Sequence, residues 1–137
     1  MVCEIMKDSA FLSKKAENAT ADDLCVAQNL VDTLEANKEG CVGMAANMIG
    51  VLKRIIAIDA GGKYMIMYNP KIVEKSGEYE ADEGCLSYMG GPKKVKRYKS
   101  IRVEYRDERF KECSKIFTEF TAQIIQHEID HCNGVLI

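Results

Sequence analysis

The segment that most constrains this chain is residues 126–131 near the C-terminus, which reads QHEIDH and contains the pattern HExxH. Residues four apart lie on one face of an α-helix, so His127 and His131 can each offer an imidazole nitrogen to one metal ion. Glu128 follows the first histidine and is placed to accept a proton from a water on that metal. Two surface histidines could have the same spacing, but a glutamate beside them within an apolar helical run favours a metal site.

A catalytic site of this type usually has three protein ligands and one open position. His127 and His131 are the only histidines in the sequence, which ends at Ile137, so we expect no third ligand downstream. Cys132 directly follows His131 and would point about 100° away from the ligand face of a helix. The third ligand is therefore expected upstream, as a cysteine, an aspartate or a glutamate.

Composition predicts one globular domain over residues 1–137, because 47% of the residues are hydrophobic and 29% are charged. A formal net charge of −2 gives no attraction for nucleic acid or an anionic membrane, and no apolar run approaches a membrane span. The N-terminus does not resemble a signal peptide. The six cysteines contain no CxxC pair, which favours free thiols in a reducing cytoplasm. We expect a cytoplasmic protein without direct nucleic-acid or membrane partners; its oligomeric state stays open.

Hydrophobic periodicity predicts a mixture of helices and strands. Thr20 is a good N-cap for a first helix, and Gly40 a plausible stop. The face of that helix expected in the core comprises Leu24, Ala27, Val31 and Leu34. Strands are expected at residues 53–59, 64–68, 71–75, 100–105 and 110–117. The second of these strands is expected to end at Asn69-Pro70, and residues 90–92 are expected to form a loop. The final helix is expected at residues 118–131, with Phe120, Ile124 and Ile125 in the core.

Two further segments are candidates for a role in a site. Residues 40–50 are dense in small side chains but match neither GxxxxGK[ST] nor GxGxxG, which argues against a nucleotide site. A tight corner between elements is the plain alternative. Cys85 lies in the segment 83–87 and could be a core thiol or a ligand. The basic residues 93–97 are expected to form a solvated face.

Three separated stretches resemble the motifs of the peptide deformylases. Residues 41–50 read CVGMAANMIG against GxGLAAxQxG, residues 83–87 match EGCLS letter for letter, and residues 126–134 read QHEIDHCNG against QHExDHLxG. Their order and rough spacing agree as well. The resemblance implies an α+β fold in which antiparallel and mixed strands surround a central C-terminal metal-binding helix.

The same resemblance implies the site and the reaction. Cys85, His127 and His131 would bind one divalent metal, commonly iron(II), with zinc, nickel or cobalt as alternatives. The family removes the N-formyl group from the initiator methionine of new polypeptides and releases formate, so the implied partners are N-formyl-methionyl peptides, including nascent chains at the ribosome. Glu128 would act as general acid and base, and the backbone N–H of Leu86 would stabilise charge on the formyl oxygen.

The chain departs from the family at one position that matters for this chemistry. Met48 stands where the first motif has a glutamine whose amide donates to the formyl oxygen, and a thioether cannot donate. Cys41 also replaces the first glycine of that motif. The favoured reading is an atypical but working deformylase. A weakly active or inactive relative that binds metal or peptides is the alternative, and a metallopeptidase is the weakest reading.

Contacts with the peptide are implied for four residues. Val42, Gly43 and Gly84 would lie along the substrate backbone. Arg97 matches a basic position near the substrate cleft, although an exposed loop arginine is an equal alternative. A methionine side-chain pocket is expected to be apolar, with the candidates Ile124, Ile125 and His127.

Overall fold

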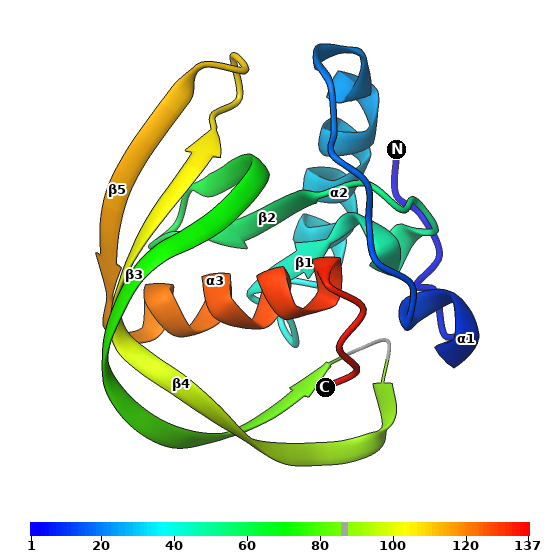
Figure 1. Ribbon diagram of the computed structural model, residues 1–137. Helices are drawn as coiled ribbons and strands as arrows, with labels where there is room; N and C mark the ends of the chain where they lie inside the picture. Colours follow the sequence, from blue (N-terminus) through cyan, green and yellow to red (C-terminus); the bar gives the residue numbers. More distant parts are fainter. Residues whose placement is uncertain (86–87) are drawn as a thin grey trace.

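The computed structural model describes residues 1–85 and 88–137, which form one antiparallel five-stranded sheet with helices on both of its sides (Figure 1). The strands, in sheet order, are β1 (Gly43–Ala45), β2 (Ile55–Asp59), β3 (Tyr64–Cys85), β4 (Tyr88–Arg106) and β5 (Glu112–Thr118). The α-helices are α1 (Ser9–Leu12), α2 (Leu24–Ala36) and α3 (Glu119–Cys132), and the short 3₁₀ helices are η1 (Ala21–Asp23) and η2 (Ala46–Ile49). The expected α+β class is confirmed.

Helix α3 lies on the concave side of the sheet, as the family resemblance implied. The long hairpin of β3 and β4 curves around it (Figure 1). Ile125 and Ile129 of α3 pack in one cluster with Ile56 of β2 and Val103 of β4, all of them buried. This packing fixes the helix against the strands, so the side chains on its remaining face have defined positions.

Strand β2 is buried on both faces. Ile56 and Ile58 belong to the cluster around α3, whereas Ile55 and Ala57 pack in a second cluster that includes Leu30 of α2. A strand covered on both faces reads as a continuous apolar run rather than an alternating one. The strand predicted at residues 53–59 is therefore confirmed, and it separates the α3 layer from the α2 layer.

Strand β3 is much longer than predicted, and the expected end at Asn69-Pro70 is wrong. The register with β4 shifts between Tyr68 and Lys71, so the proline sits in an irregularity of the ladder. Asn69 has a φ of 52° and its side-chain amide bonds both backbone groups of Ala19. These hydrogen bonds to a distant segment stabilise a bulge at the point where the local sequence indicated the end of the strand.

The loop predicted at residues 90–92 is also wrong, because these residues belong to β4. The pairing with β3 is irregular there, moving from Glu83–Lys93 to Cys85–Tyr88. Gly91 has a φ of 82°, which a glycine adopts without strain. The glycines and proline that predicted a turn are thus accommodated in an irregular part of the strand.

The first helical region was predicted correctly at its N-terminal cap but not at its C-terminal end. Thr20 forms the expected cap, with a reciprocal capping box to Asp23. Helix α2 ends at Ala36 rather than near Gly40. Leu24 is 54% exposed, because it stands at the first position of α2, before the helix turns its apolar face to the sheet.

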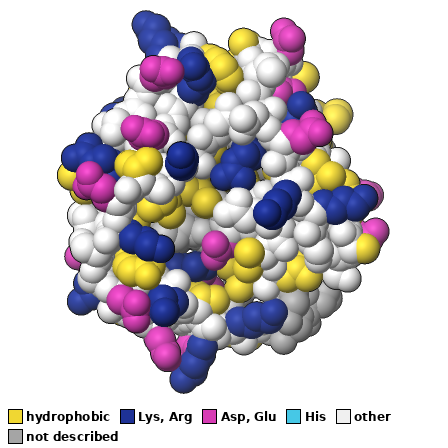
Figure 2. All heavy atoms as spheres, viewed as in Figure 1, with side chains coloured by type: hydrophobic (Ala, Val, Ile, Leu, Met, Phe, Trp, Pro, Cys, Tyr) yellow, Lys and Arg dark blue, Asp and Glu magenta, His cyan; other side chains and the backbone are white. Residues whose placement is uncertain are grey.

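Charged side chains of both signs are scattered over the face drawn in Figure 2, without a patch of one sign. Exposed charges of the described residues also pair across strands, for example Lys96 with Glu78 and Arg102 with Glu74. Exposed pairs of this kind contribute little to stability. In the described part of the chain, no helix has the length and apolar character needed to cross a bilayer.

Candidate metal centre and cleft

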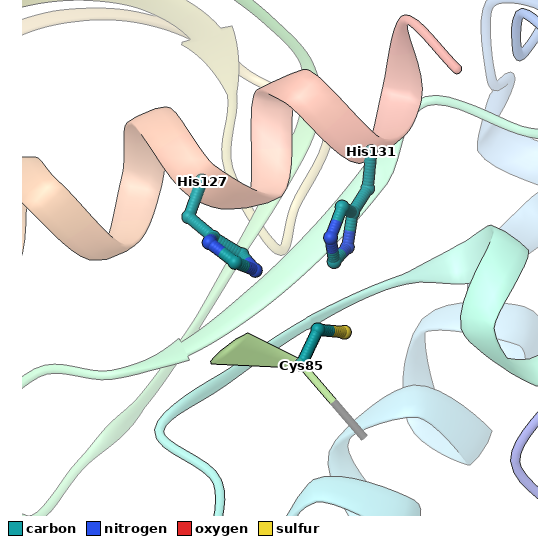
Figure 3. A group of neighbouring side chains, drawn as sticks. All are labelled: Cys85, His127 and His131. Atoms are coloured by element: carbon teal, nitrogen blue, oxygen red, sulfur yellow. The ribbon is translucent and has the colours of Figure 1, made fainter. Parts of the chain in front are cut away.

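Three potential ligands meet between α3 and the end of β3. His127 and His131 project from successive turns of α3, and Cys85 reaches toward them from the last residue of β3 (Figure 3). One ligand atom of each lies within 4.8 Å of the others. Both histidines are buried and Cys85 is partly so. The HExxH pattern predicted the two histidines and the family resemblance implied Cys85, and the structure brings the three side chains together.

This cluster fits a tetrahedral metal ion. Metal–sulfur and metal–nitrogen bonds of about 2.3 and 2.1 Å place tetrahedral ligand atoms roughly 3.3–3.6 Å apart, so small side-chain shifts would close the set around an ion. Two buried polar atoms at the cluster, Oε1 of Glu128 and Nδ1 of His131, have no hydrogen-bond partner among the described residues, although they lie 3.2 Å apart. Buried polar atoms without partners are rare in proteins and fit a site that receives a cation and water.

The electrostatics of the cluster favour a thiolate. Burial opposes ionisation of Cys85, but hydrogen bonds from His127 and His131 outweigh it and lower the pKa of the thiol from 9.0 to about 7. Burial likewise opposes the charge on both imidazoles. Cys85 and nearby carboxylates nevertheless raise the pKa of His127 to about 9 and that of His131 to about 10. Thiolate and imidazole are the ligand types of zinc and iron(II) sites, where a cation replaces the shared protons.

Glu83 contacts the imidazole of the candidate ligand His127 and orients it. Its Oε1 lies 2.7 Å from Nδ1 of His127, which leaves Nε2 to face the cluster. Arg97 donates to both oxygens of Glu83 and, at 2.7 Å, to Oδ2 of Asp130. Burial opposes the charge on Glu83, but its bonds to His127 and Arg97 lower its pKa to about 2. A carboxylate that holds a ligating histidine in this way fixes its tautomer and orientation.

Two more side chains extend this network, and sequence reasoning missed them. The Nε2 atom of Gln123 donates to Glu83 Oε2 at 2.9 Å, and the hydroxyl of Tyr79 donates to Gln123 Oε1 at 3.1 Å. Glu83 itself could have been found, because it belongs to the same motif, residues 83–87, that contains Cys85. No local signal marks Tyr79 or Gln123.

Arg97 does not line the cleft. It is buried in β4, so the exposed-loop alternative is wrong, and its guanidinium is engaged by the two carboxylates of Glu83 and Asp130. The structure therefore places Arg97 behind the metal ligands rather than along a substrate path.

A cleft of about 200 Å³ opens directly onto the cluster. Val42, Gly43 and Gly84 line it, as do Cys85, His127 and Glu128. Phe120, expected in the core, is instead 59% exposed at the first turn of α3 and lines the cleft with Ile124. Ile125 is fully buried in the core cluster and is not among the residues that line the cleft.

Gly43 is needed where the cleft meets Glu128. A Cβ atom at this position would lie 2.7 Å from Cγ2 of Ile124 and 3.0 Å from Oε2 of Glu128. Both distances are shorter than ordinary contacts, so only glycine lets β1 approach α3 this closely. Nearby, burial and the charge of Glu128 raise the pKa of Cys41 to about 12, so that thiol stays neutral beside the cluster.

Met48 lies against the cluster but not along the cleft. It is 1% exposed in η2, and its Sδ is 3.9 Å from Sγ of Cys85. Together with Cys85 and His131 it lines a separate small cavity. The other predicted oxyanion group, the backbone of Leu86, lies outside the described residues.

The fold and the cluster are those of a metal-dependent hydrolase of the HExxH type, with Cys85 beside the two histidines. The family model for polypeptide deformylases matches residues 2–137. The chain therefore belongs to the peptide deformylase family, whose members remove N-formyl groups from nascent chains.

Individual relatives agree with this assignment. A peptide deformylase of Clostridium beijerinckii is 50% identical over the full length of both chains. One from Thermoanaerobacter pseudethanolicus is 41% identical over 91% of this chain and 79% of its own. Among solved structures, a peptide deformylase from Legionella pneumophila superposes with a TM-score of 0.90 at 31% identity, covering 99% of this chain and 83% of that one.

Proposed function

We propose that this chain hydrolyses the N-formyl group of N-formyl-methionyl peptides and releases formate, with the reaction centred on Cys85, His127, His131 and Glu128. The observation that carries the proposal is the convergence of three separated sequence motifs on one cleft. Nascent chains emerging from the ribosome are the expected cellular substrates.

Cys85, His127 and His131 would hold one divalent metal, and iron(II) is the proposed native ion. The mixed set of one thiolate and two imidazoles suits iron(II) and zinc, and also accepts nickel or cobalt. When bound, such an ion would polarise the formyl carbonyl and lower the pKa of a water molecule in the site. Glu83 and Arg97 would keep His127 oriented for that task.

Glu128 is proposed as the general base and then the general acid. Its carboxylate is 4% exposed, lines the cleft and keeps one oxygen without a hydrogen bond. It would accept a proton from the attacking water as the water oxygen bonds to the formyl carbon. It would return that proton to the amine nitrogen as the C–N bond breaks, giving formate and a free N-terminus.

The substrate would occupy the cleft between β1 and the end of β3. Val42, Gly43 and Gly84 offer backbone groups and little side-chain bulk along its walls. Phe120 and Ile124 supply apolar surface for the first side chain of the peptide. An apolar pocket with few polar groups is typical of a site that recognises a methionine side chain.

Met48 supports a second candidate, a deformylase of reduced activity. A thioether at this position donates no hydrogen bond to the formyl oxygen, and the loss of one oxyanion donor typically lowers turnover by about 10²–10³. The intact ligand set and Glu128 favour a working enzyme, so we expect measurable but slow turnover.

The decisive experiment measures formate release from a formyl-Met peptide by protein loaded anaerobically with iron(II), with Glu128→Ala as the blank. Turnover above the blank supports the deformylase. Bound metal without turnover would leave the weakly active or peptide-binding alternative. Cleavage of unformylated peptides would instead indicate a metallopeptidase.

A further inference from the structure

Gln123 brings a carboxamide to the part of the cleft that is proposed to hold the first side chain of the peptide. It stands one turn before His127 on α3, and residues four apart on a helix share a face. It lines the cleft together with Phe120 and Ile124, which supply the apolar surface there. Among the described residues that line the cleft, it is the only one with a side-chain amide. The first side chain of a substrate would therefore lie beside this amide.

The orientation of the amide is fixed by two hydrogen bonds. Its Oε1 accepts from the hydroxyl of Tyr79 at 3.1 Å, and its Nε2 donates to Oε2 of Glu83 at 2.9 Å. A carboxylate only accepts hydrogen bonds, so the nitrogen of the amide, and not its oxygen, must face Glu83. Burial raises the pKa of Tyr79, so its hydroxyl keeps the proton that it donates. Since Tyr79 engages the oxygen, the polar group that remains wholly unused is an N–H.

This second N–H of Gln123 has no partner in the part of the chain that the structure describes. A carboxamide nitrogen carries two hydrogens, and the bond to Glu83 uses one of them. Glu83 does not need the other, because Arg97 donates to both of its oxygens and His127 contacts one of them. Water can satisfy the unused donor in an open cleft. A bound side chain that excludes water leaves it unpaired, unless that side chain carries an acceptor.

The acceptor strength of the first side chain should therefore matter. The sulfur of methionine is a weak acceptor, and the methylene that replaces it in norleucine accepts no hydrogen bond. Methionine sulfoxide has a polar S=O group in the same place. An entirely apolar pocket would reject that group, because burial of a polar group without a hydrogen bond is unfavourable. A pocket with an unused N–H donor would not.

We propose that Gln123 sets the side-chain specificity of this cleft, so that the chain also deformylates peptides whose N-formyl-methionine is oxidised to the sulfoxide. Gln123 donates its second N–H to the sulfoxide oxygen, and more weakly to the sulfur of unoxidised methionine. The inference rests on the proposed deformylase reaction and names a further substrate class for the same site.

Three formyl peptides that differ only in their first residue test the inference. That residue is methionine, norleucine or methionine sulfoxide, and each peptide is assayed with wild type, Gln123→Leu and Tyr79→Phe. Gln123→Leu also removes a bond to Glu83, so only the ratio of kcat/KM between two peptides on one protein is compared, because a general loss cancels in that ratio. Tyr79→Phe is the matched control, since it weakens the same network but keeps the amide in the cleft.

In wild type we expect the kcat/KM of the sulfoxide peptide to equal or exceed that of the norleucine peptide. In Gln123→Leu this ratio should fall about tenfold, the effect of leaving one buried polar group without its hydrogen bond. Tyr79→Phe should keep the wild-type ratio. Equal ratios in wild type and Gln123→Leu would overturn the inference. An equal fall in Tyr79→Phe would also overturn it, because the effect would then come from the network and not from contact between the amide and the substrate.

Failure of the proposed reaction would give a different result. If no formyl peptide is hydrolysed, calorimetry measures the affinities of the three corresponding unformylated peptides for the same proteins. A sulfoxide-to-norleucine affinity ratio that is lower in Gln123→Leu than in wild type would then support the role of Gln123 in the cleft without the reaction. An unchanged ratio, or no binding of any peptide, would overturn both. Circular dichroism confirms that each variant is folded.

Discussion

Nδ1 of His127 and Oε1 of Glu83 lie 2.7 Å apart in a buried contact that joins α3 to β3. The contact orients the imidazole and leaves its other nitrogen facing Cys85. Arg97 neutralises the carboxylate from the opposite side. Binding of a metal by these histidines would therefore depend also on Glu83 and Arg97, which are not among its candidate ligands.

Replacement of Glu83 by glutamine should weaken metal binding without abolishing the site. Loss of the charged partner of a ligating histidine typically costs about 10–100-fold in metal affinity. Chelator competition with zinc(II) measures the change. Glu80→Gln, an exposed acid on the same strand, is the matched control. Equal affinities in the two variants would show that Glu83 does not support His127.

Replacement of Glu128 by alanine or glutamine should remove turnover and leave metal content intact. General acid–base catalysis contributes about 10²–10⁴ to the rate, and glutamine preserves the size of the side chain in its narrow site. Formate release and elemental analysis of the same samples measure the two effects. Turnover near the wild-type rate in Glu128→Gln would reject the acid–base role.

Cys85→Ala should lose the metal, because two imidazoles alone leave the site one ligand short. The exposed Cys25 offers a control, since Cys25→Ala removes a thiol that is not part of the cluster. Elemental analysis after dialysis checks the outcome. Full occupancy in Cys85→Ala would mean that a different side chain is the third ligand.

Met48→Gln should raise turnover on a formyl-Met peptide. The family resemblance implies that a carboxamide at this position donates to the formyl oxygen, and the gain is bounded by the roughly 10²–10³-fold value of one such donor. The increase should appear in kcat more than in KM, because the donor acts on charge that develops in the transition state. An unchanged kcat would mean that another group already fills this position.

Gly43→Ala should impair the enzyme far more than Gly84→Ala, although both glycines line the cleft. A Cβ at Gly43 meets Ile124 and Glu128 below 3.1 Å, whereas one at Gly84 meets no atom of the described residues within 4 Å. Such overpacking costs about 1–3 kcal/mol and would displace Glu128. Thermal unfolding and formate release of both variants test this, and equal behaviour would contradict it.

Much of the site could be predicted because its motifs are local. The spacing of His127 and His131 is a helical property, and the search for an upstream ligand together with the family resemblance led to Cys85. The partners of Arg97 were not predictable, since Glu83 and Asp130 come from different elements and only the folded sheet brings them together.

Errors in the fold have a common cause. Asn69-Pro70 and residues 90–92 carry real turn signals, but the long pairing of β3 with β4 absorbs them as irregularities. Phe120 fits the apolar period of α3, yet the helix begins at the mouth of the cleft and leaves it exposed. In each case the tertiary structure overrides the local conformational preference of the residues.

Arg97 joins Glu83 on the sheet to Asp130 on the helix, so the two halves of the metal site are clamped together by protein alone. The entropic cost of bringing these distant segments together is therefore offset by protein contacts when the chain folds, and ion binding does not have to offset it. An enzyme built in this way can exchange its ion without unfolding. Damage to a labile ion such as iron(II) would then be repaired by replacing the ion in the same protein molecule.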